Sequence, residues 1–244
     1  MKLSLVFPSR NQSERLIHNL KETVLPYFDA LPFDYEVIVV VNNSDEANCR
    51  IMEEAKPSLP GNVVYLPFDP NRGKGRAIKR GIEAAKGEYV LFMDADLATD
   101  LHCMDAYWDK LDQQEAIVGS RHMKGSLIVN PAPFLRRVMS FGSKTLIKMK
   151  FHLGLHDTQC GFKLFQTEVA KKMVRKQIIS EFAFDIEYLY YLKLNGYSYL
   201  EIPVRWTDDP DSTIKHPLKT AWAFYKDMRR IKKNKKNYIE EKTC

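Results

Sequence analysis

Short apolar runs, each followed by a polar turn, dominate the first half of the chain. They are rich in Val, Ile, Leu and Phe, which is typical of strands buried on both faces in a parallel sheet. The four runs are Leu3–Pro8, Tyr35–Val41, Val63–Pro67 and Tyr89–Met93. The second run is almost continuously apolar, which predicts a central strand.

Amphipathic stretches alternate with these runs. A polar turn over 42–45 leads into a helix that ends before Pro57, and Lys74–Lys86 predicts a further helix closed by Gly87. The helix after the first run is expected to have Asn11 or Ser13 as its N-cap. Its apolar positions at helical spacing are Leu16, Ile17, Leu20 and Val24.

The second half is less regular. Ala116–Val118 continues the sheet, Tyr199–Val204 adds a late strand, and Phe134–Phe151 and Phe184–Asn195 predict helices. Strands that alternate with helices predict βαβ units, and hence an α/β fold with a mostly parallel sheet flanked by helices. We expect one domain over residues 1–215 and a basic amphipathic helix or tail over residues 216–244.

Composition indicates where such a domain would work. No apolar stretch approaches the roughly 18–20 residues that a membrane span needs, and we expect no signal peptide. The scattered cysteines form no CxxC pair, which favours reduced thiols in the cytoplasm. These cysteines are Cys49, Cys103, Cys160 and Cys244. Cys160 is expected to be a small packing residue rather than a nucleophile.

The excess positive charge lies near the C-terminus. Residues 215–244 hold 10 Lys or Arg and 3 Asp or Glu, a net of +7, whereas the rest holds 27 and 28, a net of −1. This pattern predicts a helix that binds a membrane surface peripherally. A helix packed on the domain with one solvated face is the alternative, and no nucleic-acid partner is expected. The apolar positions at helical spacing are Leu218, Trp222, Tyr225, Met228 and Ile231.

Two carboxylates follow the fourth apolar run. Positions i and i+2 of an extended chain point the same way, so Asp94 and Asp96 are expected to face one spot beyond the strand. Loops that leave the sheet at Ser9 and Asn42 would converge there, at the edge where open α/β sheets bind ligands. Two hard oxygen ligands suit Mg²⁺ or Mn²⁺. The alternative is a strand followed by a helix that one Asp caps.

Residues 71–77 form a glycine-rich basic loop that opens a helix, a natural cradle for a phosphate. The loop matches neither the Walker A nor the dinucleotide fingerprint, because no Ser or Thr follows its lysine at the required spacing and position 78 is Ile. A plain turn with solvated charges explains it about equally well. His152 and His156 have the spacing of a zinc pair, but Gly154 between them and the lack of further ligands argue against zinc.

Together these segments resemble the family 2 glycosyltransferases, which have the Rossmann-like GT-A fold of nucleotide-diphospho-sugar transferases. The matching segments are the opening strand with Pro8 and Asn11, Arg72-Gly73-Lys74-Gly75, Asp94-Ala95-Asp96 and Gly119-Ser120-Arg121. Three more segments resemble the dolichyl-phosphate glucosyltransferase branch, near the dolichyl-phosphate mannose synthases. These are Asp157-Thr158-Gln159-Cys160-Gly161-Phe162-Lys163, Phe184-Asp185-Ile186-Glu187, and Ile202-Pro203-Val204-Arg205-Trp206 with Ser212.

The resemblance implies roles for individual residues. Asp94 and Asp96 would bind the metal that bridges the donor diphosphate. Arg121 and Arg205 would meet anionic oxygens of the acceptor phosphate or the leaving diphosphate. The acceptor side would include Gln159 and Ser212, and Asp157 and Asp185 are the remaining catalytic candidates. The nucleotide-sugar site would add Pro8, Arg10, Gln12, Asn42, Lys74 and Ala95.

The nature of the acceptor decides whether a catalytic base is needed. A lipid phosphate has a second pKa of about 6 and is already a nucleophile near neutral pH. A hydroxyl acceptor would make Asp157 or Asp185 the candidate base. Asp185 and Glu187 also fit the charges of a first helical turn, and Arg205 also fits a solvated strand residue.

Three positions depart from the family's usual residues. Arg10 and Gln12 stand where a Tyr and an acidic residue are usual, and Asn42 stands where an Asp contacts the nucleobase. An amide can donate as well as accept, whereas a carboxylate only accepts. The base of the donor is therefore open, with UDP-glucose as the first expectation and GDP-mannose as the second.

The sequence thus predicts an inverting, metal-dependent glycosyltransferase that moves a hexose from a nucleoside diphosphate sugar to polyprenyl phosphate at the cytoplasmic membrane face. Transfer to a glycan hydroxyl is one alternative. A sugar-nucleotide pyrophosphorylase is another, although residues 8–11 lack the glycine expected there. A third is a non-catalytic, membrane-associated family member with a decayed nucleotide pocket.

Overall fold

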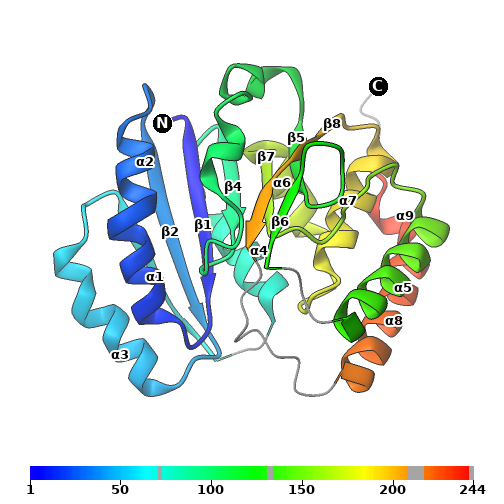
Figure 1. Cartoon of the computed structure of the whole chain (residues 1–244), viewed down its shortest axis with the longest axis horizontal. Helices are drawn as coiled ribbons and strands as arrows, with labels where there is room; N and C mark the ends of the chain where they lie inside the picture. Colours follow the sequence, from blue (N-terminus) through cyan, green and yellow to red (C-terminus); the bar gives the residue numbers. More distant parts are fainter. Residues whose placement is uncertain (71–72, 131–133, 208–216, 242–244) are drawn as a thin grey trace.

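The computed structural model (Figure 1) describes residues 1–70, 73–130, 134–207 and 217–241, and for residues 134–141, 217 and 218 it describes the backbone alone. A central sheet is covered by helices on both faces. The predicted α/β architecture, a mostly parallel sheet flanked by helices, is confirmed.

Seven strands form the main sheet in the order β3-β2-β1-β4-β7-β5-β8, and β6 pairs with β9 in a small second sheet. Only β7 runs antiparallel to its neighbours, β4 and β5, among the pairings of the described residues. The strands are β1 (Leu3–Ser9), β2 (Tyr35–Asn42), β3 (Val63–Asp69), β4 (Tyr89–Met93), β5 (Ala116–Ser120), β6 (Leu127–Val129), β7 (Phe162–Gln166), β8 (Tyr199–Pro203) and β9 (Arg205–Thr207).

The helices form two layers. One layer packs on the sheet face that carries Val6 of β1, and it holds α4 (Lys74–Ala84), α5 (Phe134–Phe151), α6 (Thr167–Arg175), α7 (Phe184–Asn195), α8 (Pro217–Lys233) and α9 (Lys235–Tyr238). The other packs on the face that carries Leu5 and Phe7. It holds α1 (Ser13–Asn19), the π-turn η1 (Leu20–Val24), α2 (Leu25–Asp29), α3 (Glu46–Ala55) and the short 3₁₀ helices η3 (Leu101–Met104) and η4 (Trp108–Gln113). A further 3₁₀ turn, η2 (Lys56–Ser58), follows α3.

The two layers explain the apolar runs of the sequence. Successive strand residues face opposite sides, so a strand covered on both faces needs apolar residues at every position. All eight residues of β2 are buried, and β2 lies between β1 and β3. Its predicted place inside the sheet is confirmed.

The N-cap prediction for the first helix is wrong. Gln12 occupies the cap position of α1, and its side chain makes no capping bond. Asn11 instead adopts a φ of 53°, and its Oδ1 accepts a hydrogen bond from the Asp45 N–H at 2.9 Å. The Ser13 hydroxyl is buried with no hydrogen-bond partner among the described residues. Asn11 therefore joins the loops after β1 and β2 rather than capping a helix.

The C-terminal helices pack on the domain. Met228, Ile231 and Tyr238 are at most 1% exposed and belong to the same core as α7. Trp222 of α8 is 59% exposed. The alternative of a packed helix with one solvated face is therefore confirmed for the described part of the tail. Within the described ranges, no helix has both the length and the apolar character to cross a membrane.

Candidate active site

The C-terminal ends of β1, β2 and β4 lie at one edge of the sheet, and the loops that follow them meet there. The Asn42 amide donates to the Gly73 carbonyl at 3.0 Å, which ties the end of β2 to the loop before α4. Lys74, the next residue, forms an ion pair with Asp94 at the end of β4. The predicted convergence of these loops is confirmed. An Asp at position 42 could not donate this hydrogen bond.

Asp94 and Asp96 lie in a tight turn and not in an extended chain, so the predicted local geometry is wrong. The Leu97 N–H donates to the Asp94 carbonyl at 3.1 Å, and Asp96 Oδ1 accepts from the Ala98 N–H at 3.1 Å. The capping alternative is also wrong, because Asp100 caps the helix that follows. Burial, and then the charge of Asp94, raise the pKa of Asp96, so the two carboxylates lie close enough to repel each other.

Helix α1 holds the backbone of this turn. Arg15 donates to the Asp96 carbonyl at 3.3 Å, and the Asn19 amide donates to the Ala95 carbonyl at 2.9 Å. Sequence reasoning did not single out either residue. The available signal was their position as polar residues on a helix whose apolar residues, Leu16 and Ile17, pack into the core.

Asp94 is held from two sides. Its N–H donates to the Gly161 carbonyl at 3.2 Å, and a Cβ on Gly161 would lie only 1.9 Å from Asp94 Oδ2. The Lys74 ammonium pairs with Oδ1. Burial acts to lower the pKa of Lys74, but the charges of Asp94 and Asp185 raise it by more. The net shift is upward, so Lys74 carries its proton.

Asp94 and Asp96 have the chemistry of a magnesium or manganese site. No group of three His, Cys, Asp or Glu side chains could hold a metal ion within the ranges described. Mg²⁺ is usually bound by one or two carboxylates together with substrate phosphates and water, so a two-carboxylate site fits that mode. His156, half of the possible zinc pair, lies 2.8 Å from a Glu201 oxygen through Nδ1.

The glycines of the basic loop are required by the packing of the chain. A Cβ on Gly73 would lie 2.0 Å from the Ser180 carbonyl oxygen, and a Cβ on Gly75 would lie 2.6 Å from Cβ of Phe184. The Arg76 N–H at the start of α4 donates to the same Ser180 carbonyl at 3.2 Å. Close contact with residues 180–184 therefore explains these glycines without a phosphate.

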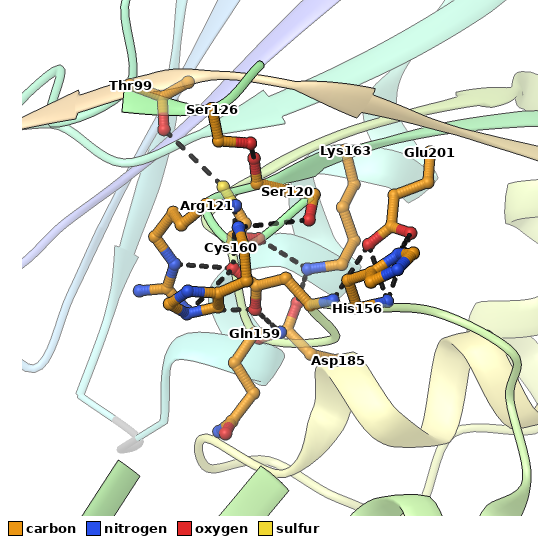
Figure 2. Close-up of polar contacts among 12 residues, drawn as sticks. Thr99, Ser120, Arg121, Ser126, His156, Gln159, Cys160, Lys163, Asp185 and Glu201 are labelled. Atoms are coloured by element: carbon orange, nitrogen blue, oxygen red, sulfur yellow. Dashed lines mark hydrogen bonds and ion pairs between the residues drawn. The ribbon is translucent and has the colours of Figure 1, made fainter. Parts of the chain in front are cut away.

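Arg121, which follows β5 and is labelled in Figure 2, forms an ion pair with the buried carboxylate of Asp157. Arg121 Nε lies 2.6 Å from Asp157 Oδ2 and Nη2 lies 3.0 Å from Oδ1. Asp157 also accepts from the N–H groups of Arg121 and Gln159, and it is 1% exposed. Burial acts to raise the pKa of Asp157, but Arg121 and these amides hold it well below its usual range. Such a carboxylate is suited to orienting Arg121 and not to accepting a proton.

Two further basic side chains lie near this pair, and sequence reasoning missed both. His122 Nε2 is 4.0 Å from Asp157 Oδ2. Lys144 of α5 interacts electrostatically with Asp157 and Arg121. Burial lowers the pKa of His122 and of Lys144, although Asp157 opposes both shifts. An anion bound here would stabilise the charged forms of both side chains.

Lys163 is a third residue that sequence reasoning missed. It is fully buried in β7, and its Nζ lies 2.6 Å from Asp185 Oδ1 and 2.5 Å from the Cys160 carbonyl oxygen. Burial raises the pKa of Asp185, although Lys163 opposes the shift. Asp185 lies in the first turn of α7, as the alternative for this residue predicted, and it also forms a buried ion pair with Lys163. The feature of the sequence that could have identified Lys163 is that it is a single lysine inside an apolar run. Cys160 is fully buried, as predicted.

Arg205 is not brought together with Arg121. Successive residues of a strand face opposite sides, and in β9 it is Trp206 whose ring lies 5.2 Å from the Arg121 guanidinium. Arg205 lines a groove of about 770 Å³ between the α1–α2 segment and residues 97–105. Its predicted contact with anionic oxygens of the acceptor phosphate or the leaving diphosphate stays a prediction, and Arg205 is an exposed strand residue, as its alternative predicted.

The remaining predicted residues surround this edge less closely. Pro8 is half-buried in β1, Arg10 is exposed and Gln12 is half-buried. Gln159 contacts Asp157 through its backbone, and its side chain extends away from the Arg121–Asp157 pair in Figure 2. Arg72, Ser212 and Cys244 lie outside the described ranges, as does residue 71 of the basic loop.

Comparison with known proteins agrees with this geometry. The model of the family described as "Glycosyl transferase family 2" matches residues 4–174 of this chain. A dolichyl-phosphate beta-glucosyltransferase of Dictyostelium discoideum is 32% identical over 243 residues, which cover 94% of this chain and 73% of that protein. The Homo sapiens protein of the same name is 33% identical over 227 residues, which cover 87% of this chain and 69% of that protein.

A solved structure shares the fold. It is glucosyl-3-phosphoglycerate synthase from Mycobacterium tuberculosis in complex with Mn²⁺, uridine diphosphate and phosphoglyceric acid. The TM-score is 0.66 at 16% sequence identity, with 99% of this chain and 80% of that chain covered. At this identity the likeness establishes the architecture of the chain.

Proposed function

Because this chain belongs to glycosyl transferase family 2, we propose that it transfers glucose, with UDP-glucose as the first choice of donor, to a polyprenyl phosphate of the dolichyl type. The relatives described above carry the name dolichyl-phosphate beta-glucosyltransferase and support this choice of sugar and acceptor. One structural observation carries the proposal. The carboxylate pair Asp94 and Asp96 lies at the same edge of the sheet as a basic cluster made of Arg121, His122 and Lys144. Both oxygens of Asp157, the carboxylate within that cluster, already accept hydrogen bonds from Arg121.

The donor diphosphate binds at Asp94, Asp96 and Lys74. A divalent ion held by Asp94 and Asp96 would neutralise charge on the leaving diphosphate. Lys74 adds a fixed positive charge beside it, and the turn that α1 holds keeps the two carboxylates together. The partial exposure of Asp94 and Lys74, 32% and 24% of their side chains, leaves room for a ligand to reach them.

The acceptor phosphate binds at Arg121, His122 and Lys144. With a second pKa of about 6, it reaches the site largely as a dianion near neutral pH. One of its oxygens attacks C1 of the glucose as the bond from C1 to the diphosphate oxygen breaks, so UDP leaves and the anomeric configuration inverts. No proton has to be removed from the acceptor, which agrees with an Asp157 committed to Arg121.

A hydroxyl acceptor is less well supported. Such an acceptor would need a base, and the two candidates from the sequence are engaged elsewhere. Asp157 is paired with Arg121, and Asp185 is paired with Lys163. We therefore place transfer to a glycan hydroxyl behind transfer to a lipid phosphate.

The membrane is reached through a surface that we call the α5–α8 surface, made of Lys150, Trp222, Tyr225 and Lys226. The rings of Trp222 and Tyr225 stack at 5.7 Å, Lys226 lies 5.5 Å over the Trp222 ring, and Lys150 of α5 lies 4.3 Å over the Tyr225 ring. Aromatic rings interleaved with cations favour the interface of an anionic membrane. We propose peripheral attachment at the cytoplasmic face, where this surface brings the enzyme to its lipid substrate.

Nucleotide binding tests the donor half of the proposal. Thermal unfolding is measured with UDP, GDP, CDP and dTDP, each with and without Mn²⁺, in wild type and Asp96→Ala. A ligand at about 100 times its Kd stabilises the native state by about 2.7 kcal/mol. We expect a Mn²⁺-dependent shift with UDP that Asp96→Ala loses. No shift with any nucleotide would favour the decayed-pocket alternative.

Product formation tests the acceptor half. UDP-glucose is supplied with polyprenyl phosphate, or with the free polyprenol of the same length as the matched control. We expect glucosylated lipid only from the phosphate. Product from the polyprenol, or from an added oligosaccharide alone, would replace the phosphate acceptor with a hydroxyl.

A further inference from the structure

Glu187 is a buried carboxylate that the proposed reaction does not use. It is 1% exposed. Its Oε1 accepts hydrogen bonds from the Ile178 N–H at 2.7 Å and the Tyr238 hydroxyl at 2.6 Å, and its Oε2 accepts from the Ile179 N–H at 3.0 Å. The Arg230 guanidinium of α8 donates to the carbonyl of Ile178 at 3.3 Å. Through these contacts, α7, α8 and α9 together hold one short segment.

That segment, residues 177–181, lies directly against residues 73–76, which are the N-cap and the first turn of α4. The Ser180 carbonyl accepts from the Arg76 N–H at 3.2 Å and leaves no space for a side chain on Gly73. The Gln177 amide donates to the Gly75 carbonyl at 3.0 Å. Gly73, Gly75 and Arg76, which flank Lys74, are therefore in contact with the segment that Glu187 holds.

Lys74 is the residue that this packing places. Its neighbours on both sides, Gly73 and Gly75, touch residues 177–184, and its own side chain reaches Asp94. If residues 177–181 shift, residues 73–76 must shift with them, because the two segments are packed without even the space for a Cβ atom between them. The position of the Lys74 ammonium thus depends on contacts made by the C-terminal helices.

We propose that Glu187 and Tyr238 are positioning residues for the donor site. Their hydrogen bonds hold residues 177–181 in place. Residues 177–181 in turn position residues 73–76 at the start of α4, so that the Lys74 side chain points at Asp94 and at the donor diphosphate. This inference rests on the proposed function for the identity of the donor. It makes the C-terminal segment part of the support of the active site, in addition to its proposed contact with the membrane.

The test compares Tyr238→Phe with Tyr191→Phe in the full chain. Both tyrosines are 1% exposed and both donate to a glutamate, Tyr191 to Glu240 at 2.5 Å. Each variant removes one phenol-to-carboxylate hydrogen bond and leaves the ring in place, so both lose similar stability. Only Tyr238 bonds to the carboxylate that holds residues 177–181.

We expect Tyr238→Phe to raise the KM for UDP-glucose about fivefold, within the factor that a hydrogen bond to a charged group represents. The kcat and the KM for polyprenyl phosphate stay within about twofold of wild type, since no group that touches the acceptor has changed. Tyr191→Phe leaves all three values unchanged. A purely structural role for Tyr238 would lower thermal stability in both variants and move the donor KM in neither, and that result would overturn the inference.

Amide hydrogen exchange provides a readout that needs no substrate. In Tyr238→Phe the amides of Ile178, Ile179 and Arg76 are expected to exchange faster than in Tyr191→Phe. Unchanged exchange at Arg76 would overturn the inference whether or not the enzyme transfers glucose. If wild type binds no nucleotide and forms no product, the proposed function fails on its own, while exchange still decides whether the C-terminal helices hold the loop.

Discussion

Gly161 leaves no space for a side chain beside Asp94. A Cβ at this position would lie 1.9 Å from Oδ2, so an alanine must displace the carboxylate or its own backbone. A misplacement of about 1 Å in a site can cost roughly 10²-fold in rate. The glycine in this motif is thus explained by a contact with a residue 67 positions earlier in the chain (161 − 94).

We expect Gly161→Ala to weaken Mn²⁺-dependent UDP binding at least about tenfold, because the metal-binding carboxylate is displaced. The measurement is calorimetric titration with UDP and Mn²⁺. Gly61→Ala is the control, since no atom lies within 4 Å of its Cβ position. Equal affinity in the two variants would show that Asp94 does not need this glycine.

Asp157 makes stability depend on pH in a defined direction. Its folded pKa lies well below its usual range, whereas the unfolded value is about 3.9. The carboxylate therefore stabilises the fold fully above about pH 4 to 5, and this contribution is lost as the pH falls toward the folded pKa.

We expect Asp157→Asn to lower stability by about 2–3 kcal/mol at pH 7, because Arg121 is left without its buried partner. The difference from wild type should shrink as the pH falls below about 4, as measured by denaturant unfolding between pH 7 and pH 3. The exposed Asp34→Asn serves as the control. A wild-type advantage that stays constant down to pH 3 would contradict the depressed pKa.

At the scale of elements, β7 decides how the two halves of the site meet. It lies between β4 and β5 and runs antiparallel to both. Its first residues therefore lie at the same edge as the last residues of β4 and β5. This arrangement brings Asp157 and Gly161, which precede β7, between Asp94 after β4 and Arg121 after β5.

Helix α8 serves two sides at once. Its inner residues Met228 and Ile231 belong to the core, and its outer residues form part of the α5–α8 surface. Attraction of one Lys or Arg to an anionic membrane is worth about 1 kcal/mol. The packed face and the proposed membrane-binding face thus belong to one helix.

We expect Lys226→Glu to reduce partitioning onto vesicles that contain anionic lipid at least about fivefold, and the effect should fall as salt is added. Trp222→Ala should weaken binding to neutral vesicles as well, because an exposed ring is lost. Co-sedimentation measures both. Lys56→Glu, next to α3, is the control for net charge, and equal loss in the two lysine variants would remove the α5–α8 surface from the proposal.

At the scale of the whole molecule, the proposed donor site and the proposed acceptor site lie side by side at one edge of the main sheet. The parallel strands β3, β2, β1 and β4 lead into the segments of the proposed donor site. In the proposed acceptor site, Arg121 and His122 follow β5 and Lys144 comes from α5. Helices from the end of the chain pack on α7 and reach residues 177–181 (Figure 1). The C-terminal helices are therefore joined to the rest of the domain through side-chain contacts with Ile178 and Glu187.

The sequence by itself determined the features that depend on local order. Periodicity and turn residues identified the parallel strands and their intervening helices, and strand ends predicted that the loops at Ser9, Asn42 and Asp94 converge. The resemblance correctly indicated the family. These features could be predicted because each is written in neighbouring residues or in the direction of a strand.

Tertiary structure alone decided the rest. The sequence pattern did not indicate β7, because Lys163 interrupts the apolar run of this strand. The buried partner of Lys163 is Asp185, which comes from α7. The turn at Asp94 and Asp96 is held by α1, and the oxygens of Asp157 are occupied by Arg121, 36 positions away. Glu187 and Tyr238 are 51 positions apart. Contacts at such separations depend on how layers pack, and no periodicity along the chain encodes them.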